Sequence, residues 1–172
     1  MEEPLDLFRL VGTTVAASQI FEVTFVLAAR LVLKQPDVLQ LEDIEPISQS
    51  KSFKQPVKGL LRELSQAQSI PGDLEVRVTS LVENRNRVIH RSFLEFGWPA
   101  AMPSEKKEQF VRLCVNVSAE SQALSIVFVD MVLSWMKKFP AMSETALKHE
   151  HLFRELAVTI RGQAAQVNAA QL

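Results

Sequence analysis

Prolines divide this sequence into long stretches whose apolar residues recur with helical spacing. Because the residue before a proline disfavours the α region, a helix that begins after Pro4 should end at Gln35-Pro36. Later stretches repeat the pattern, and none alternates as a strand does. We therefore expect an all-α protein, an antiparallel bundle of about five helices. The predicted helices cover residues 5–34, 57–67, 74–96, 104–138 and 144–167.

The length of 172 residues suits a single domain that includes the whole chain. With 47% apolar and 23% charged residues, the composition excludes an intrinsically disordered protein.

The helical pattern breaks down over residues 36–56, where acidic residues gather, and this indicates a long connection. Ser104 is predicted to cap the fourth helix. The Ala- and Gln-rich end, 162–172, should continue the last helix and fray.

Charge and cysteine content restrict the class of protein further. A net charge of -1 excludes the strongly basic balance of a bulk nucleic-acid coat protein. The single cysteine, Cys114, cannot form an intramolecular disulfide and fits a reducing compartment.

The acidic N-terminus lacks the basic region of a signal peptide. The most apolar stretches, 20–33 and 124–136, contain charges and are shorter than the ~18 residues of a spanning helix. We expect a cytoplasmic protein without a membrane partner.

No pattern in the sequence predicts a metal or a cofactor. His149 and His151 are two residues apart, so they should point to nearly opposite sides of a helix. The chain has neither a Cys-x-x-Cys pair nor a glycine-rich phosphate loop. Trp98 and Trp135 are expected to pack in the core or at helix ends rather than to stack on bases. We expect no metal and no cofactor.

The third predicted helix carries the most informative anomaly. Placed about 100° apart, its apolar residues form one stripe, and Arg85 lies in the middle of that stripe. A guanidinium stays charged at neutral pH, so an acidic side chain or an anionic ligand should meet it. Glu22 and Asp130, each isolated in an apolar run, are the candidate internal partners. The stripe consists of Leu74, Val78, Leu81, Val82, Val88, Ile89 and Phe96, with Phe93 at its border.

Several polar residues surround Arg85 on the same helix. Asn86 and His90 are four residues apart and should lie one above the other. Arg85 and His90 are about 140° apart on a regular helix, so a second copy of the chain or a distorted helix is needed to bring them together. Arg87 and Arg91 are candidate RNA-binding residues on the outer side, where the alternative is an ordinary solvated face. In a dimer, this basic excess would form a positive cleft for phosphates.

The segment RNRVIH at residues 85–90 resembles the signature of the HEPN superfamily: an Arg, a polar residue that is often Asn, three further residues and a His. In that family the motif lies late in a helix of a small all-α bundle. Members commonly dimerise, with the two motifs facing each other. Many are metal-independent endoribonucleases of toxin–antitoxin and anti-phage systems, and others are non-catalytic. The resemblance implies a homodimer, an RNA substrate, and an antitoxin or regulatory protein as a possible partner.

The chain departs from the family in one respect. Related toxins are often silenced by modification of a tyrosine shortly after the His, whereas this chain contains no tyrosine. Phe93 and Phe96 occupy that neighbourhood. That mode of regulation is therefore not expected here.

The residue types suit cleavage of RNA without a metal. His90 is the candidate general acid/base, since histidine has an ordinary pKa of about 6.5. Arg85 would stabilise charge on the phosphoryl oxygens, and Asn86 would position the phosphate or the imidazole. Two alternatives stay open. The first is a HEPN-like dimer that binds RNA or acts as a scaffold without cleaving it. The second is a plain helical adaptor with Arg85 paired internally.

Overall fold

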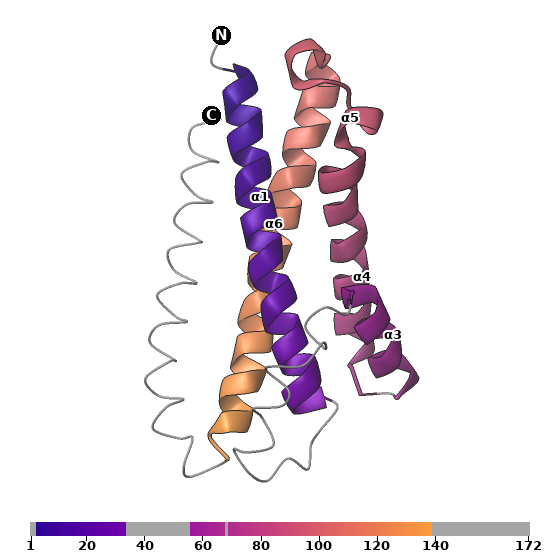
Figure 1. Ribbon diagram of the computed structural model, residues 1–172, viewed down its shortest axis with the longest axis vertical. Coiled ribbons are helices and arrows are strands. Elements are labelled where there is room, and N and C mark those ends of the chain that lie inside the picture. The colour runs from indigo at the N-terminus through magenta and orange to yellow at the C-terminus, as the bar shows by residue number, and fades with distance from the viewer. Residues whose placement is uncertain (1–2, 34–55, 68, 139–172) are drawn as a thin grey trace.

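The computed structural model describes residues 3–33, 56–67 and 69–138, and every regular element in these ranges is helical (Figure 1). The all-α prediction is confirmed for this part of the chain. The elements are α1 (Glu3–Ala28), the π-helical turn η1 (Ala29–Leu33), α3 (Val57–Gln66), α4 (Gly72–Asn86), the π-helical turn η4 (Arg87–Arg91), α5 (Ser92–Glu95), the 3-10 turn η5 (Pro99–Ala101) and α6 (Ser104–Met136).

The two longest helices, α1 and α6, lie side by side and run in the same direction (Figure 1). The Ser118 hydroxyl of α6 donates a hydrogen bond of 3.0 Å to the Thr14 hydroxyl of α1. Further along both helices, the rings of Phe25 and Phe128 are 5.2 Å apart. Residue numbers therefore rise together along the pair. The prediction of an antiparallel bundle is wrong for α1 against α6.

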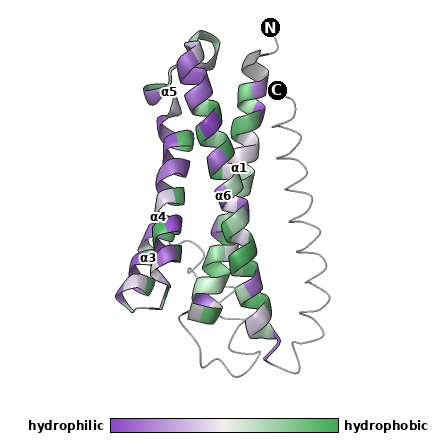
Figure 2. Ribbon diagram, turned by 180° about the vertical axis from the view of Figure 1, so that it is seen from behind, coloured by the Kyte–Doolittle hydropathy of each residue, from purple (hydrophilic) through white to green (hydrophobic). Residues whose placement is uncertain are grey.

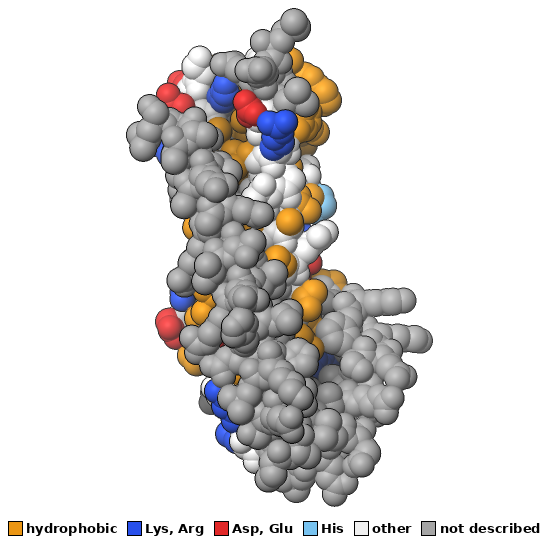
Figure 3. Space-filling view, turned by 90° about the vertical axis from the view of Figure 1, so that its left-hand side faces the viewer, with side chains coloured by type: hydrophobic (Ala, Val, Ile, Leu, Met, Phe, Trp, Pro, Cys, Tyr) orange, Lys and Arg blue, Asp and Glu red, His pale blue; other side chains and the backbone are white. Residues whose placement is uncertain are grey.

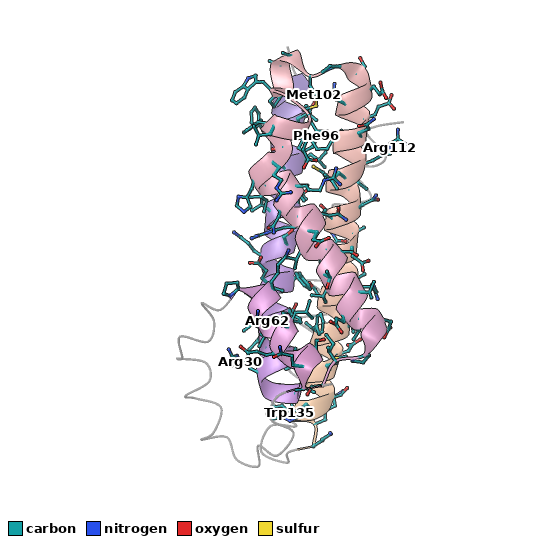
Figure 4. The ribbon with its side chains drawn as sticks, turned by 90° about the vertical axis from the view of Figure 1, so that its right-hand side faces the viewer. Arg30, Arg62, Phe96, Met102, Arg112 and Trp135 are labelled. Carbon is teal, nitrogen blue, oxygen red and sulfur yellow. The ribbon has the colours of Figure 1, made fainter. Side chains whose placement is uncertain are left out.

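The rod formed by α4, η4 and α5 runs opposite to α6. Near its beginning, Arg77 Nε lies 2.7 Å from Glu120 Oε1. Just after its end, the rings of Phe96 and Phe110 are 5.2 Å apart. Figure 4 shows Phe96 pointing into the bundle, whereas Arg112 on α6 points away from it. The antiparallel arrangement thus holds between this rod and α6.

The core is richest between α1 and α6, where Figure 2 shows more hydrophobic colour than on α3 and α4. Phe21, Phe25 and Phe128 form a buried aromatic cluster there. By length and composition alone, the helical ranges Asp6–Ala28 and Ser104–Met136 could each span a membrane. In the most apolar 18-residue segment of each range, 44% and 39% are buried inside the protein, respectively. The core helices of soluble proteins often have the same length and apolar composition, so these two helices are weak evidence for a membrane protein.

Small polar side chains line part of the α1–α6 contact. The Thr14 hydroxyl donates to the Leu10 carbonyl at 2.9 Å, and Ser18 donates to the Thr14 carbonyl at 2.8 Å. Cys114 is fully buried beside them, and this burial raises the pKa of its thiol to about 12. Bonds to carbonyls of the same helix allow these polar groups to be buried without an unpaired hydroxyl.

The apolar stripe predicted for the third helix is buried almost throughout. Ile89 is partly buried, but Phe93 at the border is exposed. Ser104 is the first residue of α6 rather than its cap, because Pro103 holds the cap position and no side chain bonds there. Several predicted features lie outside the described residues: the helix 144–167, residues 36–55 of the connection 36–56, the end 162–172, and the two nearby histidines, His149 and His151.

Candidate functional site

Arg85 meets an acidic side chain from a distant part of the sequence. Its Nη2 lies 2.9 Å from Glu22 Oε1 on α1, and both side chains are about two-thirds or more buried, with 25% and 34% exposed. Its Nη1 donates to Asn86 Oδ1 at 3.2 Å. The Nε atom is buried and has no hydrogen-bond partner among the described residues. Asp130, the other candidate partner, is exposed on α6.

The helix is distorted within the motif itself. The π-helical turn η4 covers Arg87–Arg91, directly after Arg85 and Asn86. In a π turn the backbone bond joins residues five apart instead of four. The angle of about 140° that a regular helix would place between Arg85 and His90 is therefore reduced. The assumption of a regular helix, which placed His90 directly above Asn86, is wrong here.

His90 is exposed (pale blue in Figure 3), and in the described part of the chain it takes part in no hydrogen bond or ion pair. Arg85 and Asn86, by contrast, are held by their mutual hydrogen bond and by Glu22. The end of α4 thus holds a guanidinium and an amide in fixed positions, and the π turn that follows carries an exposed imidazole. No contact joins His90 to Arg85 within the single chain.

The basic residues around the motif are more neutralised than their sequence neighbourhood indicates. Arg87 Nε donates to Glu95 Oε2 at 3.0 Å, and Arg87 Nη1 to Asn84 Oδ1 at 3.5 Å. Arg87 is therefore paired with an acid, although 43% of its side chain is exposed. Arg91 is exposed and forms no ion pair within the described residues, as expected for the outer side.

Nearer the beginning of α4, Arg77 donates a hydrogen bond to Glu120, and this bond raises the pKa of the Arg77 guanidinium. The acid within this stretch of sequence, Glu83, lies 3.9 Å from Lys58 on α3 instead. Three of the four arginines between residues 77 and 91 are thus compensated by acids that lie outside that stretch. In the described part of the chain, tertiary contacts therefore neutralise most of the basic excess counted between residues 77 and 91.

An exposed aromatic pair beyond the motif was not predicted. The rings of Phe93 and Trp98 are 4.9 Å apart at 34°, and the two residues are 52% and 60% exposed. Gly97, with φ of 95°, turns the chain between them, and its N–H donates to the Phe93 carbonyl at 3.2 Å. A glycine after a helix end commonly brings the next residue onto the last turn. In the sequence, Gly97 followed by Trp98 at the end of the predicted helix 74–96 was the feature that could have indicated this aromatic pair.

The described residues contain no group of three or more His, Cys, Asp or Glu side chains that could hold a metal ion. Comparison of the chain with protein-family models, with curated proteins and with solved structures gives no significant match. The resemblance to the HEPN superfamily therefore rests on the segment 85–90 and on its position late in a helix of an all-α bundle.

Proposed function

We propose that this protein is a metal-independent endoribonuclease of the HEPN type. The observation that supports it most is the π turn at Arg87–Arg91, which interrupts the helix between the fixed Arg85–Asn86 pair and the exposed His90. π turns inside α-helices are frequent at functional sites. A second π turn, η1 at Ala29–Leu33, lies outside the motif, so the distortion supports the proposal only together with the positions of Arg85, Asn86 and His90.

The proposed reaction uses the 2′-hydroxyl of the substrate as its nucleophile. That hydroxyl loses a proton and its oxygen attacks the adjacent phosphorus, while the bond from phosphorus to the 5′-oxygen breaks and the 5′-oxygen gains a proton. His90 transfers protons, and Arg85 stabilises the negative charge that develops on the phosphoryl oxygens. The products are a 2′,3′-cyclic phosphate and a 5′-hydroxyl. DNA, which lacks the nucleophile, should not be cut.

A homodimer is part of this proposal. The side chain of Arg85 is directed at Glu22 in the single chain, and His90 has no partner among the described residues there. A second copy that placed its own motif opposite the first would supply a second guanidinium and imidazole to one groove. It would also add the positive charge that one chain lacks, because Arg91 would be present twice.

The test compares cleavage of RNA by the parent protein and by His90→Ala, each with and without EDTA. We expect a loss of at least about 100-fold in His90→Ala, since general acid–base catalysis contributes roughly that much or more, and no effect of EDTA. Arg112→Ala is the matched control, because Arg112 is exposed on α6 and points away from the bundle. Equal cleavage by His90→Ala and the parent would show that the assignment is wrong.

The internal Arg85–Glu22 pair favours a second candidate, a HEPN-like RNA-binding or scaffold protein, or a helical adaptor, without catalysis. In this case Arg85 serves to join α4 to α1. The parent protein would then leave RNA uncut, while Arg85→Ala would lower its stability.

We place the proposed nuclease in the cytoplasm, in a toxin–antitoxin or anti-phage system, with an antitoxin or regulatory protein as its partner. Expression of the parent should then be toxic to cells. The toxicity should disappear in both Arg85→Ala and His90→Ala.

A further inference from the structure

We propose that Phe93 and Trp98 form a stacking platform for the bases of single-stranded RNA, beside the motif. The proposal rests on the nuclease function proposed above and adds the class of substrate. A large exposed aromatic pair is unusual on a soluble domain, where such rings are normally buried. Here two rings meet at 4.9 Å and both stay more than half exposed.

Helix capping explains why the two rings meet but not why they are aromatic and exposed. An αL cap commonly brings an apolar contact between the residue after the glycine and the last helical turn. Leucine or valine would satisfy that contact. The anchoring in this structure comes instead from Phe96, which is buried against Phe110 just before Gly97. The outer faces of Phe93 and Trp98 are therefore left free for a ligand.

Positive charge flanks the platform. Arg91 lies two residues before Phe93 and is exposed without an ion pair among the described residues. The Lys106 ammonium donates to the Glu95 carbonyl at 3.1 Å, which holds it beside the same turn without neutralising it. The Glu95 carboxylate accepts from Arg87. Stacking rings next to uncompensated cations match a nucleotide chain, which presents bases and phosphates in alternation.

The position of the platform relative to the motif indicates how it would act. His90 precedes Phe93 by three residues, across the junction of the π turn η4 and α5, and both residues are exposed. A base stacked on the rings would hold the strand while a neighbouring phosphate reaches His90. Stacking tolerates any base, because every base has a π face, but a duplex keeps its bases covered. The platform therefore selects single strands without selecting a sequence.

Binding can be measured separately from cleavage with a single-stranded oligodeoxynucleotide, which the proposed chemistry cannot cut. The chain has two tryptophans, and Trp98 is 60% exposed whereas Trp135 is buried. We expect the oligonucleotide to quench Trp98 emission in the parent and in Trp135→Phe. The same sequence as a duplex should quench it far less.

Variants test whether aromatic rings, rather than apolar area alone, carry the binding. Their dissociation constants are measured by the fluorescence anisotropy of a dye-labelled single-stranded oligodeoxynucleotide, because the Trp98 variants lose the quenched tryptophan. Phe93→Leu and Trp98→Leu should each raise the dissociation constant about tenfold, within the range for loss of one stacked base, and Trp98→Phe should recover most of the affinity. Leu94→Ala is the matched control, because Leu94 is 87% exposed on the same turn and has no ring. Its dissociation constant should stay within about twofold of the parent's, well below the effect of a lost ring.

Three results of the binding and mass measurements would overturn the platform: no quenching by single strands, an equal effect of Leu94→Ala and Trp98→Leu, or a change of solution mass in Trp98→Leu with unchanged binding. The last two would identify an apolar protein contact instead. Cleavage of RNA at the parental rate by Trp98→Leu would likewise refute the platform while leaving the nuclease intact. Quenching by single strands without cleavage of RNA by the parent protein would refute the nuclease while leaving the platform intact.

Discussion

The α1–α6 pair and the rod of α4, η4 and α5 use polar residues in opposite ways. Between α1 and α6, the buried hydroxyls of Thr14, Ser18 and Ser118 bond to carbonyls of their own helix or to each other. The buried Ser121 hydroxyl has no partner among the described residues. Along the rod, long charged side chains reach other elements, and His90, Phe93 and Trp98 remain exposed. The first region needs its polar groups only for close packing. The second holds groups that packing does not require, and this is where a function should be sought.

The largest expected difference between the two regions is in stability. Phe128 is fully buried between Phe21 and Phe25, so Phe128→Ala should lower the free energy of unfolding by about 3–5 kcal/mol, as expected for a phenylalanine removed from a core. Trp98→Leu should lower it by less than about 0.5 kcal/mol, because it lies on the surface. Urea unfolding monitored by circular dichroism measures both. A comparable loss in the two variants would remove the distinction between a core region and a surface site.

Breaking one of the ion pairs that join the two regions should have an intermediate effect. Glu22→Ala leaves the half-buried Arg85 guanidinium without its acid, and we expect a loss of about 1–2 kcal/mol, less than for a fully buried pair because both side chains retain some exposure. A double-mutant cycle with Arg85→Ala isolates the interaction between them. The exposed pair of Glu108 and Arg112 on α6 is the matched control. A coupling no larger than that of the control would mean that Arg85 is not anchored by Glu22.

How far the sequence predicted these features depended on whether they are local. Helix ends follow from proline and glycine, so the limits of three helical stretches were predicted within a few residues: α1 with η1, α4 with η4 and α5, and α6. The choice between Glu22 and Asp130 for Arg85 depends on which faces of α1 and α6 meet. Those two helices run in the same direction. The periodicity of apolar residues within one helix does not determine the direction or the face of the helix that packs against it.

The candidate site shows the same limit. The sequence placed Arg85 correctly in a buried stripe, but the π turn at Arg87–Arg91 adds a residue that a regular periodicity cannot reveal. The acid that pairs with Arg77 lies 43 residues away in the sequence, beyond any local count of charge. Local patterns therefore identified the motif, whereas its electrostatic surroundings were set by the tertiary contacts.

Substituting alanine for glycine should change the free energy of unfolding in opposite directions in the two regions, by smaller amounts. Gly12 lies within α1, and a Cβ added there would meet open space, so Gly12→Ala should stabilise the protein by about 0.5–1 kcal/mol. Gly97 also has open space, but its φ of 95° is unfavourable for any side chain. Gly97→Ala should destabilise by about 1–2 kcal/mol and reduce quenching of Trp98 by single strands. Thermal unfolding of both variants measures the contrast, and a stabilising Gly97→Ala would contradict the assigned turn.

The smallest expected effect is the pH dependence that the buried thiol gives to the α1–α6 contact. Burial raises the pKa of Cys114 from 9.0 to about 12, so the folded protein keeps the thiol proton where the unfolded chain loses it. The unfolded state then binds fewer protons, and stability must fall as the pH rises. Between pH 7 and 9 the loss should be about 0.4 kcal/mol, and it should continue toward pH 12. Cys114→Ala should lack this component of the slope in urea unfolding at each pH. An identical slope in both proteins would show that the thiol is open to water, and that the tight packing assigned to this pair of helices does not extend to Cys114.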